Sequence, residues 1–111
     1  PQEVTMPKYL VAASYTADGV AGLVKDGGTG RRAKVAEAVE RLGGSVEAFY
    51  FALGETDAYV ILDLPDHETG TALSLAVNAS GAVRATTTLL LTPEQVDEAV
   101  RKSVDYMPPG V

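Results

Sequence analysis

The chain of 111 residues is long enough for one hydrophobic core and too short for two, and its 46% hydrophobic and 22% charged residues are typical of a globular domain. A formal net charge of −6 argues against nucleic acid or an anionic membrane as a partner, because phosphate groups would repel the protein. Cysteine is absent and His67 is the single histidine, which excludes disulfides, thiolate metal sites and multi-histidine metal sites within one subunit.

We therefore expect one domain over residues 6–106, in a cytoplasmic protein that uses no metal and no other cofactor. Residues 1–5 precede Met6, a candidate natural start, and are interpreted as an expression remnant or an N-terminal extension. Residues 107–111 are interpreted as a tail. No apolar run reaches the roughly 20 residues that a membrane-spanning helix needs, and no signal-peptide pattern is present.

The first half of the chain predicts a strand followed by an interrupted helix. Residues 8–16 are rich in strand-forming side chains and contain no breaker. A short helix over 17–25 then meets a glycine-rich segment, 26–30, where we expect a loop. Apolar residues recur at helical spacing through 31–42, and a pair of glycines ends that second helix.

The second half predicts a hairpin, a helix, a strand and a final helix. Two strand-like runs, 45–53 and 58–64, are separated by a short turn. An aspartate caps a helix over 66–79, a strand follows over 82–91, and Pro93 begins a C-terminal helix after a capping threonine. The order predicts an α+β, ferredoxin-like βαββαβ fold: a four-stranded antiparallel sheet with both crossover helices on one face, plus the extra helix.

The other face of the predicted sheet has no helix to cover it. We expect the hairpin to pair Leu53 with Ala58, and alternation from that register places one pair of tyrosines on the uncovered face. We assign the tyrosines of the first strand and the polar residues of the last strand to the same face. The predicted ligand-binding residues on this face are Tyr9, Tyr15, Tyr50, Tyr59 and Arg84.

A half-apolar sheet face predicts a partner, and the simplest partner is a second copy of the chain. Two facing sheets would enclose a cavity suited to a small, partly aromatic or carboxylated ligand. The alternative interpretation is that the tyrosines only pack at an interface, with their hydroxyls in water.

Two residues are weak candidates for proton abstraction. His67 lies at the start of a predicted helix, where the simpler interpretation is an exposed surface residue. Asp57 follows the hairpin turn, where aspartate is commonly structural. The glycines and arginines over 27–32 offer amides and positive charge to an anion, but they lack the Walker lysine and the dinucleotide-binding spacing, so a flexible insertion is the simpler interpretation.

Several segments together resemble the GYD domain family, over about residues 6–92. The Gly-x-Tyr-Asp turn of that family is matched at Gly54 and Asp57, while Thr56 stands at the tyrosine position. The resemblance implies a dimeric α/β-barrel protein with a ferredoxin-like fold, and it implies no catalytic set. The segments that carry the resemblance are residues 9–16, 27–32, 42–44 and 49–57.

Three functions are consistent with these observations. The leading hypothesis is a homo-oligomeric small-molecule-binding protein with its cavity between facing sheets, and with neither nucleic acid nor membrane as a partner. The second is a cofactor-independent isomerase, cyclase or oxygenase that uses the same cavity. The third is a structural assembly unit in which the facing sheets leave no cavity.

Overall fold

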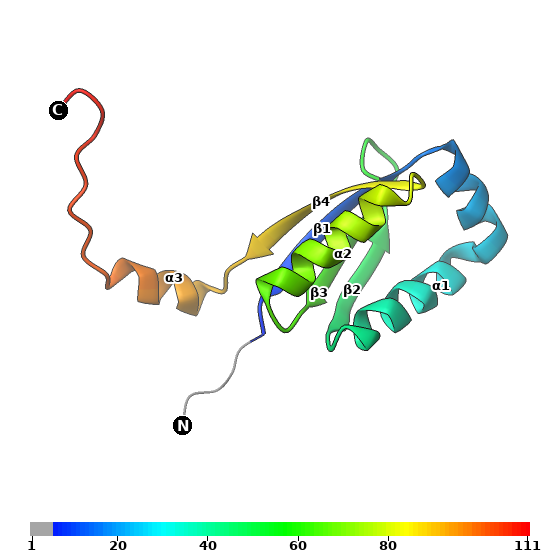
Figure 1. Ribbon diagram of the computed structural model, residues 1–111, viewed down its shortest axis with the longest axis horizontal. Helices are drawn as coiled ribbons and strands as arrows, with labels where there is room; N and C mark the ends of the chain where they lie inside the picture. Colours follow the sequence, from blue (N-terminus) through cyan, green and yellow to red (C-terminus); the bar gives the residue numbers. More distant parts are fainter. Residues whose placement is uncertain (1–5) are drawn as a thin grey trace.

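The computed structural model describes residues 6–111, so the interpretation of residues 1–5 lies outside the described part of the chain. The order of strands and helices is the one expected, and the α+β, ferredoxin-like prediction is confirmed. The elements are β1 (Lys8–Tyr15), α1 (Ala17–Arg41), β2 (Ser45–Phe51), β3 (Ala58–Asp63), α2 (His67–Ala79), β4 (Val83–Leu90) and α3 (Pro93–Val100) (Figure 1).

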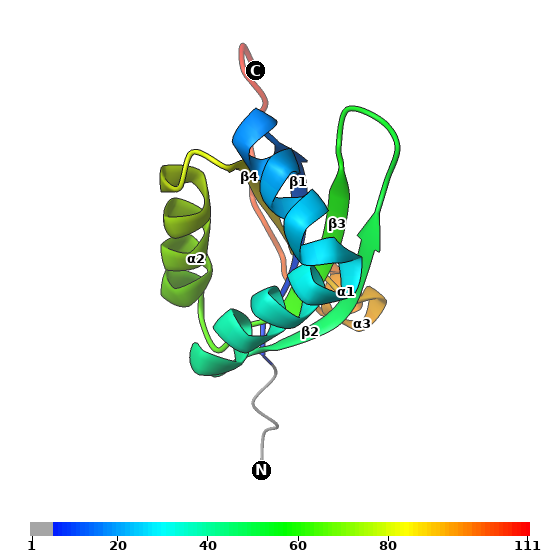
Figure 2. The same cartoon turned by 90° about the vertical axis from the view of Figure 1, so that its right-hand side faces the viewer.

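The four strands form one antiparallel sheet in the order β2-β3-β1-β4. Each strand–helix–strand crossover carries its helix over the same face: α1 lies over β2 and α2 lies over β4. Figure 2 shows these two helices lying apart from each other, with α2 at the left of the sheet and α1 nearer the viewer. The opposite face of the sheet, called the open face below, carries neither helix.

Side chains next to the helix starts fix where the helices begin. The hydroxyl of Thr16 accepts a hydrogen bond from the amide of Gly19 at 3.3 Å, and Asp66 accepts one from the amide of Thr69 at 2.8 Å. A capping box of Thr92 and Gln95 begins α3. These are the capping residues that the sequence indicated.

The expected interruption of α1 is present in the glycine-rich segment, but it is confined to one residue, and no loop over 26–30 is inserted. Only Gly27 leaves the helical conformation, with φ 74° and ψ 168°. A single glycine tolerates positive φ without steric cost, and the chain resumes the helix at the next residue. Gly27 therefore divides α1 into two helical segments that meet at a kink.

The hairpin between β2 and β3 has a different register from the expected one. Phe51, not Leu53, pairs with Ala58, so the connecting loop is longer than the expected one. The amide of Ala52 donates a hydrogen bond to the carbonyl of Asp57 at 2.7 Å and closes this loop. The register differs by two residues. Because side chains alternate with period two, the assignment of faces in the hairpin is unchanged.

The hydrophobic core fills the space between the covered face of the sheet and the two helices. Val39 of α1 and Leu64 after β3 are fully buried, and Leu62 is 2% exposed. They pack with Val60 and with Tyr9. Among the described residues no polar or charged residue other than tyrosine is buried at this level, so the covered face is held chiefly by apolar packing.

The C-terminal helix does not take part in this core. Helix α3 contains no buried residue, and Val100 is 78% exposed. Figure 1 shows α3 and the following tail projecting away from the sheet as an arm. Over residues 6–111, every helix is too short or too polar to cross a membrane.

Candidate functional site

The structure divides the five predicted ligand-binding residues between the two faces of the sheet. Tyr50 and Tyr59 lie on the open face, where their Cα atoms are partners across β2 and β3, and Arg84 lies there on β4. Tyr9 and Tyr15 lie on the covered face, so their assignment to the open face is wrong. Cα partners share a face, and Tyr9 pairs with Leu62 and Leu89, which point toward the helices.

The open face is apolar in the middle and charged at its two ends. Tyr50 is 70% exposed and Tyr59 is 43% exposed. At one end the Lys8 ammonium contacts two carboxylates, Glu47 at 2.5 Å and Asp63 at 2.8 Å, which leaves a net negative charge. Their hydrogen bonds and charges raise the pKa of Lys8.

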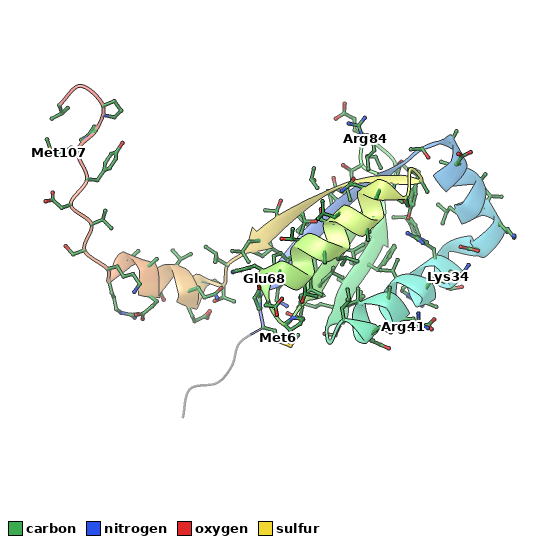
Figure 3. All side chains as sticks on the ribbon, in the orientation of Figure 1. Met6, Lys34, Arg41, Glu68, Arg84 and Met107 are labelled. Atoms are coloured by element: carbon green, nitrogen blue, oxygen red, sulfur yellow. The ribbon has the colours of Figure 1, made fainter. Side chains whose placement is uncertain are left out.

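The other end of the open face carries the positive charge of Arg84. Arg84 is the Cα partner of Ser14 on the neighbouring strand. It makes no ion pair with any described residue. Figure 3 shows Arg84 at the end of the sheet where the β2–β3 hairpin turns.

A cavity that the sequence did not predict lies on the covered face, between α1, α2 and the sheet. This inner pocket has a volume of about 60 Å³. Its walls are mostly apolar side chains from both helices and all four strands, and its polar side chains are Tyr15, Arg31, Ser74 and Thr87. Apolar wall residues include Val11, Val35, Phe49, Val60, Leu73 and Val77.

A wider opening, the outer hollow, adjoins the inner pocket between the first half of α1 and the end of α2. Its volume is about 410 Å³, within the range of small-molecule sites. The two cavities have Tyr15 and Arg31 in common as polar wall residues, and the outer hollow adds the carboxylates Asp18 and Asp26. The two cavities therefore lie next to each other and share part of their walls.

Arg31 stands at the junction of the two cavities. Its Nε atom is buried and has no hydrogen-bond partner among the described residues. Asp26 is engaged elsewhere, since it accepts a hydrogen bond from the Lys34 ammonium at 2.9 Å. That hydrogen bond, with the positive charges of Lys34 and Arg31, lowers the pKa of Asp26.

The catalytic candidate His67 lies on the other side of α2. Its Nδ1 atom is 2.5 Å from the hydroxyl of Tyr9, and the two rings meet edge to face. The Tyr9 ring packs flat on Gly70, where a Cβ atom would lie 3.3 Å from it. Burial and the charges of Asp66 and Glu68 raise the pKa of Tyr9.

The second catalytic candidate, Asp57, is held by backbone hydrogen bonds at the end of the hairpin. Its carboxylate accepts a hydrogen bond from the amide of Tyr15 at 2.8 Å, and its own amide donates to the carbonyl of Ala13 at 2.8 Å. Asp57 and His67 line neither the inner pocket nor the outer hollow. The two candidates are therefore not brought together.

Arg31 begins the predicted helix over 31–42, and the sequence contained a signal for the direction in which it points. On a helix, Arg31 and Val35 are one turn apart and share a face, and Val35 belongs to the apolar stripe that was recognised. Continuing that stripe backward by one turn would have placed Arg31 toward the sheet. Among residues 6–111, no cluster of three or more metal-ligating side chains is found.

Comparison with known proteins gives one match and two negative results. No curated protein and no solved structure matches this chain. The model of the GYD domain family matches residues 9–100. These residues include all three helices and all four strands except Lys8, the first residue of β1. The match spans most of the chain and agrees with the resemblance seen at the hairpin and the glycine-rich segment, so the protein belongs to the GYD domain family.

Proposed function

We propose that this protein binds a small, largely apolar molecule in the outer hollow, and that it does so as a homodimer. The observation that carries the proposal is the volume of the outer hollow, about 410 Å³, which lies in the range of small-molecule sites. Most of its walls are apolar, and it shares Leu73, Val77 and Val83 with the inner pocket.

This location differs from the cavity between facing sheets expected from the sequence. That cavity relied on Tyr9 and Tyr15 pointing away from the helices, and they point toward them. Tyr15 still lines a cavity, but it is the outer hollow, together with Arg31. The ligand proposed here therefore contacts the helices as well as the sheet.

Native mass spectrometry of protein purified gently from its own host tests ligand binding. We expect a defined extra mass on the wild-type protein and its loss in Val77→Phe, because Val77 lines both cavities and phenylalanine would narrow them. Ala72→Phe is the matched control, since Ala72 lies on the same helix, is exposed and lines neither cavity. An extra mass that survives in Val77→Phe would contradict this site.

The open face supports the homodimer. Sheet faces that bury apolar side chains against each other are a common packing mode, and twofold dimers are the commonest oligomers. A twofold axis that lies between the sheets, perpendicular to the strands, would bring the negative end of one open face against Arg84 of the other, twice. An axis parallel to the strands would bring like charges together, so charge favours the first arrangement.

Sedimentation equilibrium tests the dimer and its orientation. We expect Tyr59→Glu to give monomers, and Leu75→Glu, the same kind of change on an exposed helix surface, to leave the dimer intact. Arg84→Glu should weaken the dimer, because it replaces the positive end of the open face with a negative one. A dimer that Tyr59→Glu leaves unchanged would contradict the use of the open face.

Catalysis without a cofactor is a second candidate function, favoured by the contact between Tyr9 and His67. The two residues line a separate hollow of about 350 Å³ beside α2, with Thr71, Ser74 and Thr87 as its other polar residues. A histidine held by a buried phenol is suited to proton transfer. This function would be supported if the wild-type protein converts the retained molecule and His67→Gln binds the molecule but does not convert it.

A further inference from the structure

Arg31 provides the positive charge of the inner pocket, and its buried Nε–H has no acceptor. The other polar side chains of the pocket are hydroxyls, and none of them accepts a hydrogen bond from Arg31. A buried guanidinium donor without an acceptor is unfavourable, and proteins rarely leave one unpaired. An acceptor that arrives with a ligand would remove this cost.

The carboxylates nearby do not neutralise Arg31 through an ion pair. Asp26 is bonded to Lys34 at 2.9 Å. Asp18 lines the outer hollow without an ion pair to any of residues 6–111. The guanidinium is therefore available to an anion in the outer hollow.

The local fold explains why an arginine is held in this position. The break at Gly27 redirects α1, so that the second half of the helix crosses the sheet beside β2. Val35, one turn after Arg31, packs against the core and lines the same pocket. The arginine and the apolar wall therefore come from one rigid helical segment.

We propose that the ligand of the outer hollow is an organic anion with an apolar body. Its acidic group accepts hydrogen bonds from Arg31, which lines both cavities, and its apolar body lies along Leu23, Leu73 and Val77. This inference rests on the proposed binding function and names its ligand class.

A matched pair of fluorescent probes tests the inference. Anilinonaphthalene sulfonate carries an apolar ring system with one anionic group, and phenylnaphthylamine has the same ring system without the charge. In Arg31→Met and Arg31→Gln we expect the Kd of the sulfonate to rise about tenfold or more, because a charge-assisted hydrogen bond is lost. The Kd of the neutral probe should change less than about twofold, which also shows that each variant is folded.

Two control variants separate the outcomes. Arg32→Met removes a positive charge from an exposed neighbouring residue and should leave both Kd values unchanged. Val77→Phe should weaken both probes, because it narrows both cavities. Equal binding of the sulfonate with and without Arg31 would overturn the anion inference and leave the outer hollow standing. Failure of Val77→Phe to affect either probe would overturn the binding function as well.

Discussion

Gly19→Ala should destabilise the fold, because Gly19 in the first turn of α1 packs against the backbone of Ala82, the residue before β4. A Cβ atom at this position would lie 2.0 Å from the carbonyl oxygen of Ala82, whereas ordinary contact begins near 3.4 Å. The helix start would have to move by about 1.4 Å, the difference between these distances. Ala82 accepts a hydrogen bond from the amide of Thr16 at 3.0 Å, and that bond would be strained by the movement.

The expected loss can be worked from these contacts. Overpacking costs about 1–3 kcal/mol and a weakened hydrogen bond about 1 kcal/mol, while the better helix propensity of alanine returns at most about 1 kcal/mol. The free energy of unfolding should fall by about 1–3 kcal/mol, which corresponds to a Tm lower by about 4 °C or more.

Gly22→Ala is the matched control, since its Cβ atom meets nothing within 4 Å in the same helix. It should raise the free energy of unfolding by up to about 1 kcal/mol. Urea and thermal unfolding followed by circular dichroism measure both variants. Equal stability of the two alanine variants would refute the close approach of α1 to Ala82.

Three further substitutions test the capping, the pKa shifts and the core. The raised pKa of Tyr9 means that its neutral phenol stabilises the folded protein below about pH 10, and that this stability is lost as pH rises through the folded pKa. Tyr9→Phe should therefore remove this loss of stability at alkaline pH, as measured by unfolding curves at a series of pH values. The hydroxyl and amide of Thr69 lower the pKa of Asp66, so Asp66→Ala should lower the Tm at neutral pH and progressively less as pH falls through the carboxyl pKa. Leu62→Ala should cost about 2–5 kcal/mol in urea unfolding, and a smaller loss would mean that the core at β3 can collapse around the cavity.

The element order could be predicted because hydrophobic periodicity and capping residues agreed along the chain. The helix starts at Thr16, Asp66 and Thr92 could be predicted, because each is a capping residue type followed by apolar residues at helical spacing. The register of the hairpin was not readable, because Ala52 and Leu53 look like strand residues but belong to the loop. An error of two residues leaves each side chain on its face.

The face of β1 could not be predicted from alternation. Its two alternating sets are both largely apolar, so the pattern separates Tyr9 and Val11 from Leu10 and Ala12 without saying which set faces the helices. Only pairing with β3 and β4 decides the question, and that information lies outside the strand. The candidate site was therefore expected on the wrong face for two of its five residues.

The place of Arg31 in a cavity wall was missed for a different reason. The arginines over 27–32 were considered only together with the glycine amides, as an anion site at a helix start, because a run of glycines lowers helix propensity and indicated a loop from 26 to 30. In the folded protein only Gly27 breaks the helix, because packing on β2 holds the flanking turns. The position of a pocket residue thus depended on tertiary contacts that no window of sequence contains.

The projecting C-terminal arm affects how the size of the protein can be measured. The radius of gyration is 17.1 Å, whereas a compact chain of this length would have about 13 Å. A single chain with this arm would leave a gel-filtration column early, at the volume of a heavier globular standard. An elution volume alone cannot distinguish an elongated monomer from a compact dimer, so the mass has to come from light scattering or sedimentation equilibrium.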